Sequence, residues 1–575
     1  MNRRTFLRKP AAPVATLFER PAASGDQPPG KGETVSKFAN KDLPATPRSL
    51  AGLAPYTGPW GPVQAAHLLR RATFGPTRAE INTAASQSLT QVLDRLFTVP
   101  ATPDPPVQGF PGDPLLPVGA PFVTGDYEGG WSARSSVRAW WLGLMLKDTT
   151  IVEKMTLFWH NHFVITFDLD GGTFDSRFAY RYCALLREQA LGNFKQLAKD
   201  MTVEPGMLKY LNGSANTVDA PNENYGRELL ELFTIGKGRT IGPGNYTTYT
   251  EADVQAAARV LTGWQHSEEN INGFFTDSLH EPGVKRFSSA FGNRTIANQG
   301  DQEYKALIDL IFDRTETAAF IVRKLYRWFV YYVIDATTEA NVIQPLAAQL
   351  RQNGYNVGPV VRTLLASEHF FDAINIGCMI KSPIDFVVGA VRQMSVTFPP
   401  ESNTVELYTA WSMLVDGAEK MQQFIGNAPN VAGWPAYWQT PQYYEMWINA
   451  MTLPLRNQFT DRIINEYGYD TNFPATVKLR IETIDWVQSL PPATAADCNL
   501  LIAEFVRHLL PFPLTANQMT FLNDTLLPGL PDFEWTVEWQ AFLADPDNMT
   551  KRSAVDSKLR AVVRQIMGLA EFHLS

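Results

Sequence analysis

Helix-start signals recur along this chain, whereas the alternating apolar and polar pattern of half-buried strands is scarce. Four of these starts have capping-box spacing, with a Ser or Thr three positions before an acidic residue: Thr77/Glu80, Thr150/Glu153, Thr250/Asp253 and Ser382/Asp385. Apolar residues follow them at helical spacing. The sequence therefore predicts an all-α or nearly all-α protein, with one large multi-helix domain or two helical subdomains.

Composition divides the chain into three expected parts. Residues 1–60 are rich in Pro, Gly, Ser and Ala and lack a long apolar period, which is typical of a disordered linker. Helical patterns run from 61 to 398, and a Pro-containing loop at 398–403 interrupts them. We expect a helical core at 61–398 and a C-terminal helical subdomain at 404–575 that packs on that core.

The first nine residues, MNRRTFLRK, resemble a twin-arginine export signal, because Arg3 and Arg4 are followed by Phe-Leu and a basic residue. The apolar stretch at 10–17 is short and interrupted by proline, whereas a working signal has a longer uncharged segment and a cleavage site. We expect a periplasmic or extracellular protein, or a cytoplasmic one if this signal does not function.

Charge, cysteine content and missing motifs exclude several classes of protein. A net charge of −8 argues against a general nucleic-acid binder, and three distant Cys without CxxC argue against a disulfide scaffold or zinc ribbon. The chain has no run of 18 apolar residues, so we expect no membrane-spanning helix. The motifs of elbow-type serine hydrolases, P-loop NTPases, dinucleotide-binding folds and HExxH zinc proteases are also absent.

His160 and His162 form a close pair in a chain that has only eight His. The helix predicted to begin at Thr150 runs into them, and residues two apart on a helix point to different faces. Both imidazoles reach one place if the helix ends near Asn161. Imidazole suits Zn, Cu, Fe or Ni, with a carboxylate as a common further ligand. The alternative is that both rings form hydrogen bonds in the core.

A second strong helical pattern covers residues 222–236 and contains several carboxylates around Arg227. Candidate further metal ligands in this segment and beyond it are Glu223, Glu228, Glu231 and His280. Paired carboxylates near an arginine can have separated pKa values and so divide the acid and base roles. The alternative is a solvated helix face with internal ion pairs.

Two basic residues farther along could hold an anion. Arg259 follows Glu251 and Asp253, and it could clamp two helices or bind an anionic ligand bidentately; a buried ion pair is the alternative. Lys285 follows His280 and could also bind an anion, although a surface lysine is the ordinary interpretation.

An aromatic-rich stretch lies between residues 434 and 447. Its rings belong to Trp434, Tyr437, Trp438, Tyr443, Tyr444 and Trp447. If they are exposed, they form a stacking platform for a sugar or polymer. If they are buried, they anchor a loop.

Several separated stretches together resemble the bacterial family called domain of unknown function 1800. They are LLRRATFG at 68–75, EKM at 153–155, WHNHF at 159–163, NEN at 222–224, RELLEL at 227–232, YTEADV at 249–254, AR at 258–259, LTGW at 261–264, HEPGVK at 280–285 and PNVAGWP at 429–435. The resemblance covers about residues 60–573. The usual His-Asp of the family is His280-Glu281 here, which keeps a carboxylate. The family has no established reaction. The resemblance implies an exported, largely helical bacterial protein, with a sulfatase-like exported partner as a suggestion.

The function expected from these patterns is that of an exported metal-dependent enzyme, either a hydrolase or an oxidoreductase. The expected ligands of a divalent transition metal are His160, His162, Glu228 and His280. The expected catalytic residues are Glu228, Glu231, Arg227 and Arg259. A metal-bound water would be the nucleophile for hydrolysis, and a redox metal would instead support oxidation. The competing hypothesis is a non-catalytic exported protein that holds a polysaccharide or protein partner through its aromatic surface.

Overall fold

The computed structural model describes residues 49–125, 129–168 and 175–575. Within them α-helix is the main element, and the strands form four separate two-stranded antiparallel sheets. The prediction of a mostly helical protein is confirmed. The chain departs from the expected nearly all-α fold between residues 240 and 296, where three of these sheets lie. The predicted export signal, and the linker up to residue 48, lie outside the described residues.

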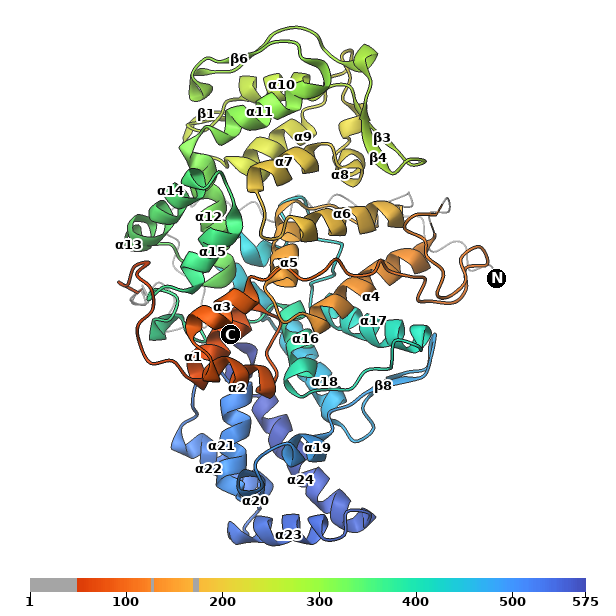
Figure 1. The fold of residues 1–575 in the computed structure, drawn as a ribbon, viewed down its shortest axis with the longest axis vertical. Helices are drawn as coiled ribbons and strands as arrows, with labels where there is room; N and C mark the ends of the chain where they lie inside the picture. The colour runs from red at the N-terminus through yellow and green to blue at the C-terminus, as the bar shows by residue number, and fades with distance from the viewer. Residues whose placement is uncertain (1–48, 126–128, 169–174) are drawn as a thin grey trace, which may run out of the picture. The chain divides into compact units, whose positions relative to one another are not determined.

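Helix α5 (Val152–His162) is buried along almost its whole length, and α4 and α6 pack against it (Figure 1). Its buried residues include Glu153, Lys154, Thr156, His160 and His162, so these side chains need polar partners inside the protein. The other helices up to residue 210 are α1 (Pro62–Ala72), α2 (Arg78–Ser86), α3 (Leu89–Leu96), α4 (Trp131–Lys147), α6 (Ser176–Glu188), α7 (Phe194–Thr202) and α8 (Pro205–Tyr210).

The sheets gather around α9 (Asn224–Glu228) and α10 (Glu251–Val260), which pack on each other. Helix α9 continues into a π-helical turn, η3 (Leu229–Thr234). The strands are β1 (Thr240–Gly242), β2 (Asn245–Tyr246), β3 (Trp264–Ser267), β4 (Asn272–Phe275), β5 (Lys285–Arg286) and β6 (Thr295–Ile296). Strand β3 pairs with β4 over four residues each, which makes it the most regular hairpin of this region.

From residue 303 onward the chain is again mainly helical. The longer elements are α11 (Glu303–Phe312), α12 (Thr315–Phe329), α14 (Gln344–Gln352), α15 (Val357–Leu365), α16 (Pro383–Gln393), α17 (Thr404–Lys420) and α18 (Thr452–Ile464). Short elements are α13 (Ala336–Thr338), η7 (Glu339–Ile343), η9 (Pro435–Tyr437), η10 (Tyr443–Trp447), β7 (Tyr469–Thr471) and β8 (Val477–Leu479).

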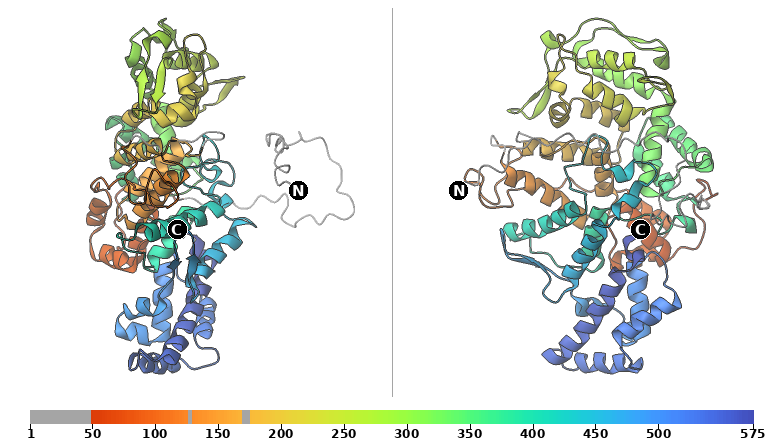
Figure 2. Two further views of the ribbon diagram at one scale, coloured as in Figure 1. Left: turned by 90° about the vertical axis from the view of Figure 1, so that its right-hand side faces the viewer. Right: turned by 180° about the vertical axis from the view of Figure 1, so that it is seen from behind.

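The last helices form a bundle in which α24 contacts α19, α21, α22 and α23 (Figure 2). They are α19 (Thr483–Gln488), α20 (Pro492–Ala496), α21 (Cys498–Leu509), α22 (Ala516–Leu526), α23 (Phe533–Leu543) and α24 (Met549–Met567). Helix α17 packs on both α4 and α16, so the two sides of the 398–403 loop are in contact. The domain boundary at this loop stays a prediction.

Three of the four predicted helix starts have the expected polar contacts. Thr77/Glu80 and Thr250/Asp253 form capping boxes, and the Ser382 hydroxyl accepts from the N–H of Asp385. The Thr150 start is wrong, because the Asp148 carboxylate accepts from the N–H groups of Thr150 and Glu153 in its place. Asp148 lies in the preceding loop, where its two oxygens can reach both donors.

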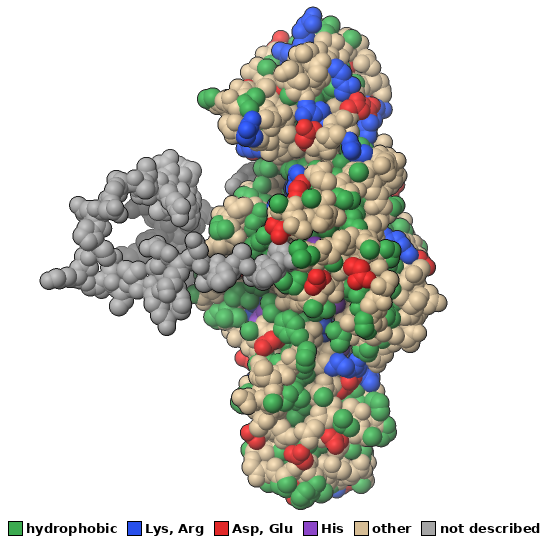
Figure 3. All heavy atoms as spheres, turned by 90° about the vertical axis from the view of Figure 1, so that its left-hand side faces the viewer, with side chains coloured by type: hydrophobic (Ala, Val, Ile, Leu, Met, Phe, Trp, Pro, Cys, Tyr) green, Lys and Arg blue, Asp and Glu red, His purple; other side chains and the backbone are tan. Residues whose placement is uncertain are grey.

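Most buried apolar residues form one continuous core, and a small cluster lies apart from it. We call this the satellite cluster; it comprises Met379, Trp434, Ala436, Tyr443, Tyr444 and Trp447. On the face drawn in Figure 3, basic and acidic side chains are interspersed. Among the described residues, each helix is too short or too polar to cross a bilayer.

Candidate functional site

His160, in the last turn of α5, uses both ring nitrogens inside the core. Its Nε2 accepts from the N–H of Gly426 at 3.2 Å, so Nδ1 is the protonated nitrogen and donates to the Tyr182 hydroxyl at 2.8 Å. The Tyr182 hydroxyl in turn donates to the carbonyl of Phe163 at 2.7 Å. Burial, with a smaller effect of Arg138, lowers the pKa of His160 to about 3. The ring is neutral, and both of its nitrogens are already engaged.

The hydrogen-bond partners of His162 belong to other elements than those of His160. Its Nε2 donates to the carbonyl of Phe233 at 2.9 Å, and its Nδ1 accepts from the Lys324 ammonium at 3.0 Å. Burial, and then Lys324, hold the pKa of His162 well below its usual value. Because α5 continues through His162, the two rings point to different neighbours. The expected convergence of the two imidazoles is therefore wrong.

His280 belongs to a buried ionic cluster near β5. Its Nδ1 lies 2.9 Å from the carbonyl oxygen of Thr262, and its Nε2 lies 3.0 Å from Oε1 of Glu303. The Lys285 ammonium is 2.7 Å from the other oxygen of Glu303, and these three charged or polar side chains are buried. Lys285 is therefore an internal ion-pair partner, which was not foreseen; it fits the structural role of fixing this loop-rich region.

The structure does not bring the four predicted metal ligands together. His160, His162 and His280 each bond to different partners, and Glu228 is half-buried on α9. Throughout residues 49–125, 129–168 and 175–575, no group of three or more His, Cys, Asp or Glu side chains is placed to hold a metal ion. The predicted metal centre therefore has no assembled ligand set in this part of the chain.

The predicted catalytic carboxylates lie around a half-exposed arginine. Arg227 pairs with Glu223 at 2.7 Å and with both oxygens of Glu251, while Glu231 pairs with Lys237. Arg227 and Glu231 are four residues apart, but no pair between them is among these bonds, because the π-helical turn that begins at residue 229 changes the helical spacing. Most of the cluster consists of partly exposed ion pairs, which contribute little to stability.

Glu228, one of the predicted catalytic carboxylates, has a raised pKa. Partial burial raises the pKa of Glu228, the nearby Glu231 raises it further, and Arg227 and Lys237 oppose both effects. The Tyr249 hydroxyl donates to Glu231 at 3.2 Å. These groups share one surface region, but ion pairing already accounts for most of their contacts.

Arg259 is half-buried in the last turn of α10 and does not form the expected clamp. The carboxylates predicted to pair with it have other partners: Glu251 binds Arg227, and Asp253 accepts from the N–H and hydroxyl of Ser288. The interpretation of Arg259 as a helix clamp through these two carboxylates is therefore wrong.

The aromatic stretch at 434–447 is mainly buried and does not form the expected open platform. Trp434, Tyr443, Tyr444 and Trp447 belong to the satellite cluster, and Trp438 is the exposed ring, at 39%. Its burial agrees with the alternative interpretation, that of a loop anchored by its aromatic side chains.

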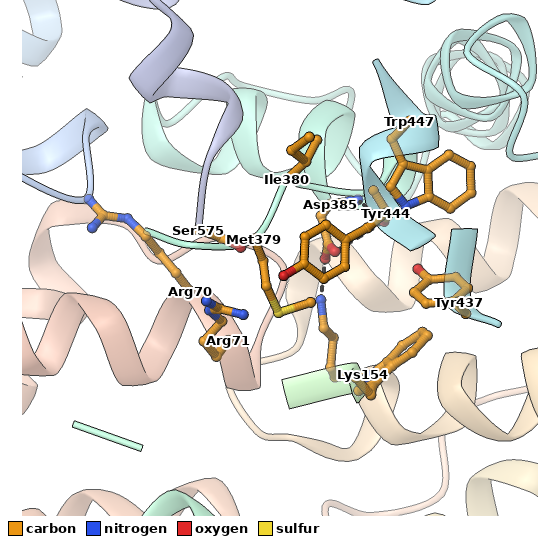
Figure 4. A pocket seen from close by; sticks show the side chains of 12 residues that line it. Arg70, Arg71, Lys154, Met379, Ile380, Asp385, Tyr437, Tyr444, Trp447 and Ser575 are labelled. Atoms are coloured by element: carbon orange, nitrogen blue, oxygen red, sulfur yellow. Dashed lines mark hydrogen bonds and ion pairs between the residues drawn. The ribbon is translucent and has the colours of Figure 1, made fainter. Parts of the chain in front are cut away.

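A small cavity lies beneath this aromatic stretch, and its walls are strongly cationic. Arg71 reaches it from α1, Lys154 from α5, and Asp385 from the first turn of α16, whereas the guanidinium of Arg70 points away toward the carbonyl of His508 (Figure 4). Tyr444 and other rings of the aromatic stretch cover one side. The cavity has a volume of about 20 Å³. We call it the cationic pocket.

Several buried N–H groups at the cationic pocket have no partner among the described residues. They are Nε of Arg70, Nε of Arg71 and Nε1 of Trp328. The side chains themselves are held in place: Arg71 donates to the carbonyls of Val330 and Asn375, at 3.3 and 3.0 Å. Buried polar groups are normally hydrogen-bonded, so a set of unpaired donors around one cavity calls for an explanation.

The charge balance near the pocket is also unusual. Two further buried cations, Lys381 and Arg456, lie behind Asp385, and Arg456 has two unpartnered nitrogens among the described residues. Asp385 is the one carboxylate side chain in the described pocket lining, and Ser575, the last residue of the sequence, also lines the pocket. Burial lowers the pKa of Arg70 to about 10 and that of Arg456 to about 9. The cause in both cases is desolvation by burial, which disfavours the charged form, and Asp385 opposes it at Arg456.

Comparison with known proteins identifies the family. The chain matches the family model described as "Protein of unknown function (DUF1800)" over residues 67–573. The chain belongs to the DUF1800 family. No curated protein and no solved structure matches it.

The cationic pocket of this DUF1800 chain combines stretches that are far apart in sequence. The motif at 68–75 supplies Arg70 and Arg71, the motif at 153–155 supplies Lys154, and the motif at 429–435 leads into the aromatic cover. Sequence reasoning did not select these three cations. One feature of the sequence could have indicated them: these charged residues lie within helices beside apolar residues that are buried, such as Leu68 and Leu69.

Proposed function

We propose that this protein captures a ligand through an anionic group, such as a carboxylate, sulfate or phosphate, in the cationic pocket. The observation that supports this proposal is the unpartnered guanidinium Nε–H of Arg71, which lines the pocket together with Lys154. Guanidinium groups match the geometry of these anions, and charge-assisted hydrogen bonds are the strongest that such donors form.

Arg70 and Arg71 are buried, and this makes their unpaired charges energetically significant. A buried charge without a partner is strongly destabilising, so natural proteins pair such charges or neutralise them. Lys154 has a partner in Asp385, but Arg70 and Arg71 bind only carbonyl or thiol acceptors in the described residues. An anion that accepts from the Nε–H group of Arg71 would pair its charge and satisfy this donor.

The size of the pocket limits what fits without movement. A volume of about 20 Å³ holds about one water-sized group. A carboxylate or a larger anion therefore requires Tyr444 and Trp447 to move outward. These rings belong to the satellite cluster, so their displacement does not open the main core.

Export remains part of the proposal, because Arg3 and Arg4 resemble a twin-arginine signal. The ligand would then be met in the periplasm or outside the cell. A metal-dependent reaction and polysaccharide binding stay predictions from the sequence. The pocket supports anion capture without either of them.

Thermal unfolding in the presence of anions tests the proposal. At constant ionic strength, acetate, sulfate or phosphate should raise the melting temperature saturably relative to chloride, with about 2.7 kcal/mol of stabilisation at one hundred times Kd. Arg71→Met should abolish the effect. Arg294→Met is the matched control, because Arg294 is an exposed arginine paired with Asp313.

A second variant guards against misfolding of Arg71→Met. Lys154→Met removes one cation of the pocket and leaves Asp385 beside the buried Lys381 and Arg456, whose charges it offsets. It should weaken anion binding while the protein still folds. Wild-type protein that shows no saturable response to any of the three anions would overturn the proposal.

A further inference from the structure

Lys154 has an environment that differs from that of an ordinary surface lysine. Its ammonium lies over the ring of Phe74 at 4.9 Å and over that of Trp328 at 5.8 Å, and its side chain is 6% exposed. Burial lowers the pKa of Lys154, Arg71 lowers it further, and Asp385 opposes both effects. Desolvation and a neighbouring cation are the two conditions that activate a lysine amine as a nucleophile.

Asp385 is positioned to exchange a proton with this amine. One carboxylate oxygen contacts Nζ of Lys154, and the other accepts from the Ser382 hydroxyl at 3.0 Å. Ser382 also caps α16, so the carboxylate is held at a helix N-terminus. The Lys154 amine, the Asp385 carboxylate and Arg71, whose Nε is unpartnered, line the same cavity (Figure 4).

We propose that the Lys154 amine forms an imine with the carbonyl carbon of a small 2-oxo acid whose carboxylate is bound by Arg71. This inference rests on the proposed anion capture and adds the ligand class. A 2-oxo acid carries its carbonyl next to its carboxylate, so one compact ligand can use both the arginine donors and the amine. A neutral carbonyl compound would leave the arginine donors unpaired.

The reaction needs no oxidant, reductant or second substrate. Asp385 takes one proton from the Lys154 ammonium, and the nitrogen lone pair forms a C–N bond while the carbonyl electron pair moves to oxygen. The carbinolamine then loses its oxygen as water, with the proton returned by Asp385 and one further proton from nitrogen. The sum is ammonium plus carbonyl giving iminium plus one water.

The pocket volume selects the smallest members of this class. Glyoxylate is the smallest 2-oxo acid and is the probe of choice for a cavity of about 20 Å³ whose aromatic cover must shift. Acetaldehyde is the matched probe, because it has the same reactive aldehyde and lacks the carboxylate.

Reductive trapping tests the inference on the full chain. The protein is incubated with glyoxylate and cyanoborohydride, digested, and the modified lysines are located by mass spectrometry. Lys154 should react with glyoxylate about tenfold faster than with acetaldehyde, a preference of ~1.4 kcal/mol. Arg71→Met should remove this preference, and sulfate should slow the labelling.

Lys324 is the internal control. It is also buried, and burial lowers its pKa to about 7, but it binds His162 and lies outside the pocket lining. Labelling of Lys154 ahead of Lys324 and of the half-exposed Lys147 supports a site built for the oxo acid. Labelling that follows amine basicity or exposure alone overturns the inference.

If anions stabilise the fold yet Lys154 stays unlabelled, the imine is excluded and anion capture stands. If neither occurs, both proposals fail.

Discussion

The side-chain oxygen of Asn161 accepts a hydrogen bond from the main-chain N–H of Trp434 at 3.0 Å. This bond joins the end of α5 to the start of the aromatic stretch. His160, one residue earlier, accepts from the N–H of Gly426. His160 and Asn161 therefore fix the 426–434 loop, which leads to the rings that cover the cationic pocket.

Gly433 makes this junction possible and provides a first prediction. Its φ is +89°, and a Cβ there would lie 2.3 Å from Oδ1 of Asn161. We expect Gly433→Ala to lower the free energy of unfolding by about 3 kcal/mol, from backbone strain together with loss of the Asn161 bond. Gly112→Ala, at φ +111° in open space, isolates the strain. Equal losses in urea unfolding would show that the contact with Asn161 is unimportant.

The second prediction concerns the role of His160. His160→Ala leaves the Gly426 N–H and the Tyr182 hydroxyl without their partner, so we expect a loss of about 2–4 kcal/mol in unfolding free energy. Bound transition metal, measured by elemental analysis, should be the same in this variant and in wild type. His266→Ala, at a half-buried ring, is the control. A stoichiometric metal in wild type that disappears in His160→Ala would restore the metal centre.

Stability should fall in mild acid. Burial lowers the pKa of His160 to about 3, whereas an unfolded histidine titrates near 6.5. The unfolded chain thus binds the extra proton below pH 6.5, and stability is lost as the pH falls from there. Between pH 6.5 and 5 this group contributes a loss of about 1.5 kcal/mol. Urea midpoints of His160→Gln should change less over this range than those of wild type; an identical change would contradict the prediction.

The half-exposed ion pairs around Arg227 should contribute little to stability. We expect Arg227→Met to lower the unfolding free energy by less than about 1 kcal/mol, because both partners, Glu223 and Glu251, remain partly solvated. Chemical denaturation measures this directly. A loss of several kcal/mol would mean that the π-helical turn depends on these pairs.

Export is tested by fractionation. Replacing Arg3 and Arg4 with Lys should retain the protein in the cytoplasm if they form a twin-arginine signal. The wild-type protein should reach the periplasm or the medium. Wild-type protein found in the cytoplasm would show that these residues form only a tail.

Local patterns predicted much of the secondary structure. The Ser382 and Thr250 helix starts could be found from sequence because the bonds that make them span three residues. The Thr150 start failed for an equally local reason, since the Asp148 carboxylate competes for the same N–H groups. The π-helical turn after Glu228 could not be foreseen, because its extra residue depends on packing around it.

The sequence by itself determined that this chain is mostly helical and that it resembles the DUF1800 family, since helical periodicity and short motifs are properties of neighbouring residues. Only the tertiary structure decided what the charged motif residues do. His160 and His162 are two residues apart yet bond to different elements, while Arg71 and Asp385, 314 positions apart, face one cavity. Burial and partners depend on which helices pack together, and that choice is made by the whole core rather than by any single stretch.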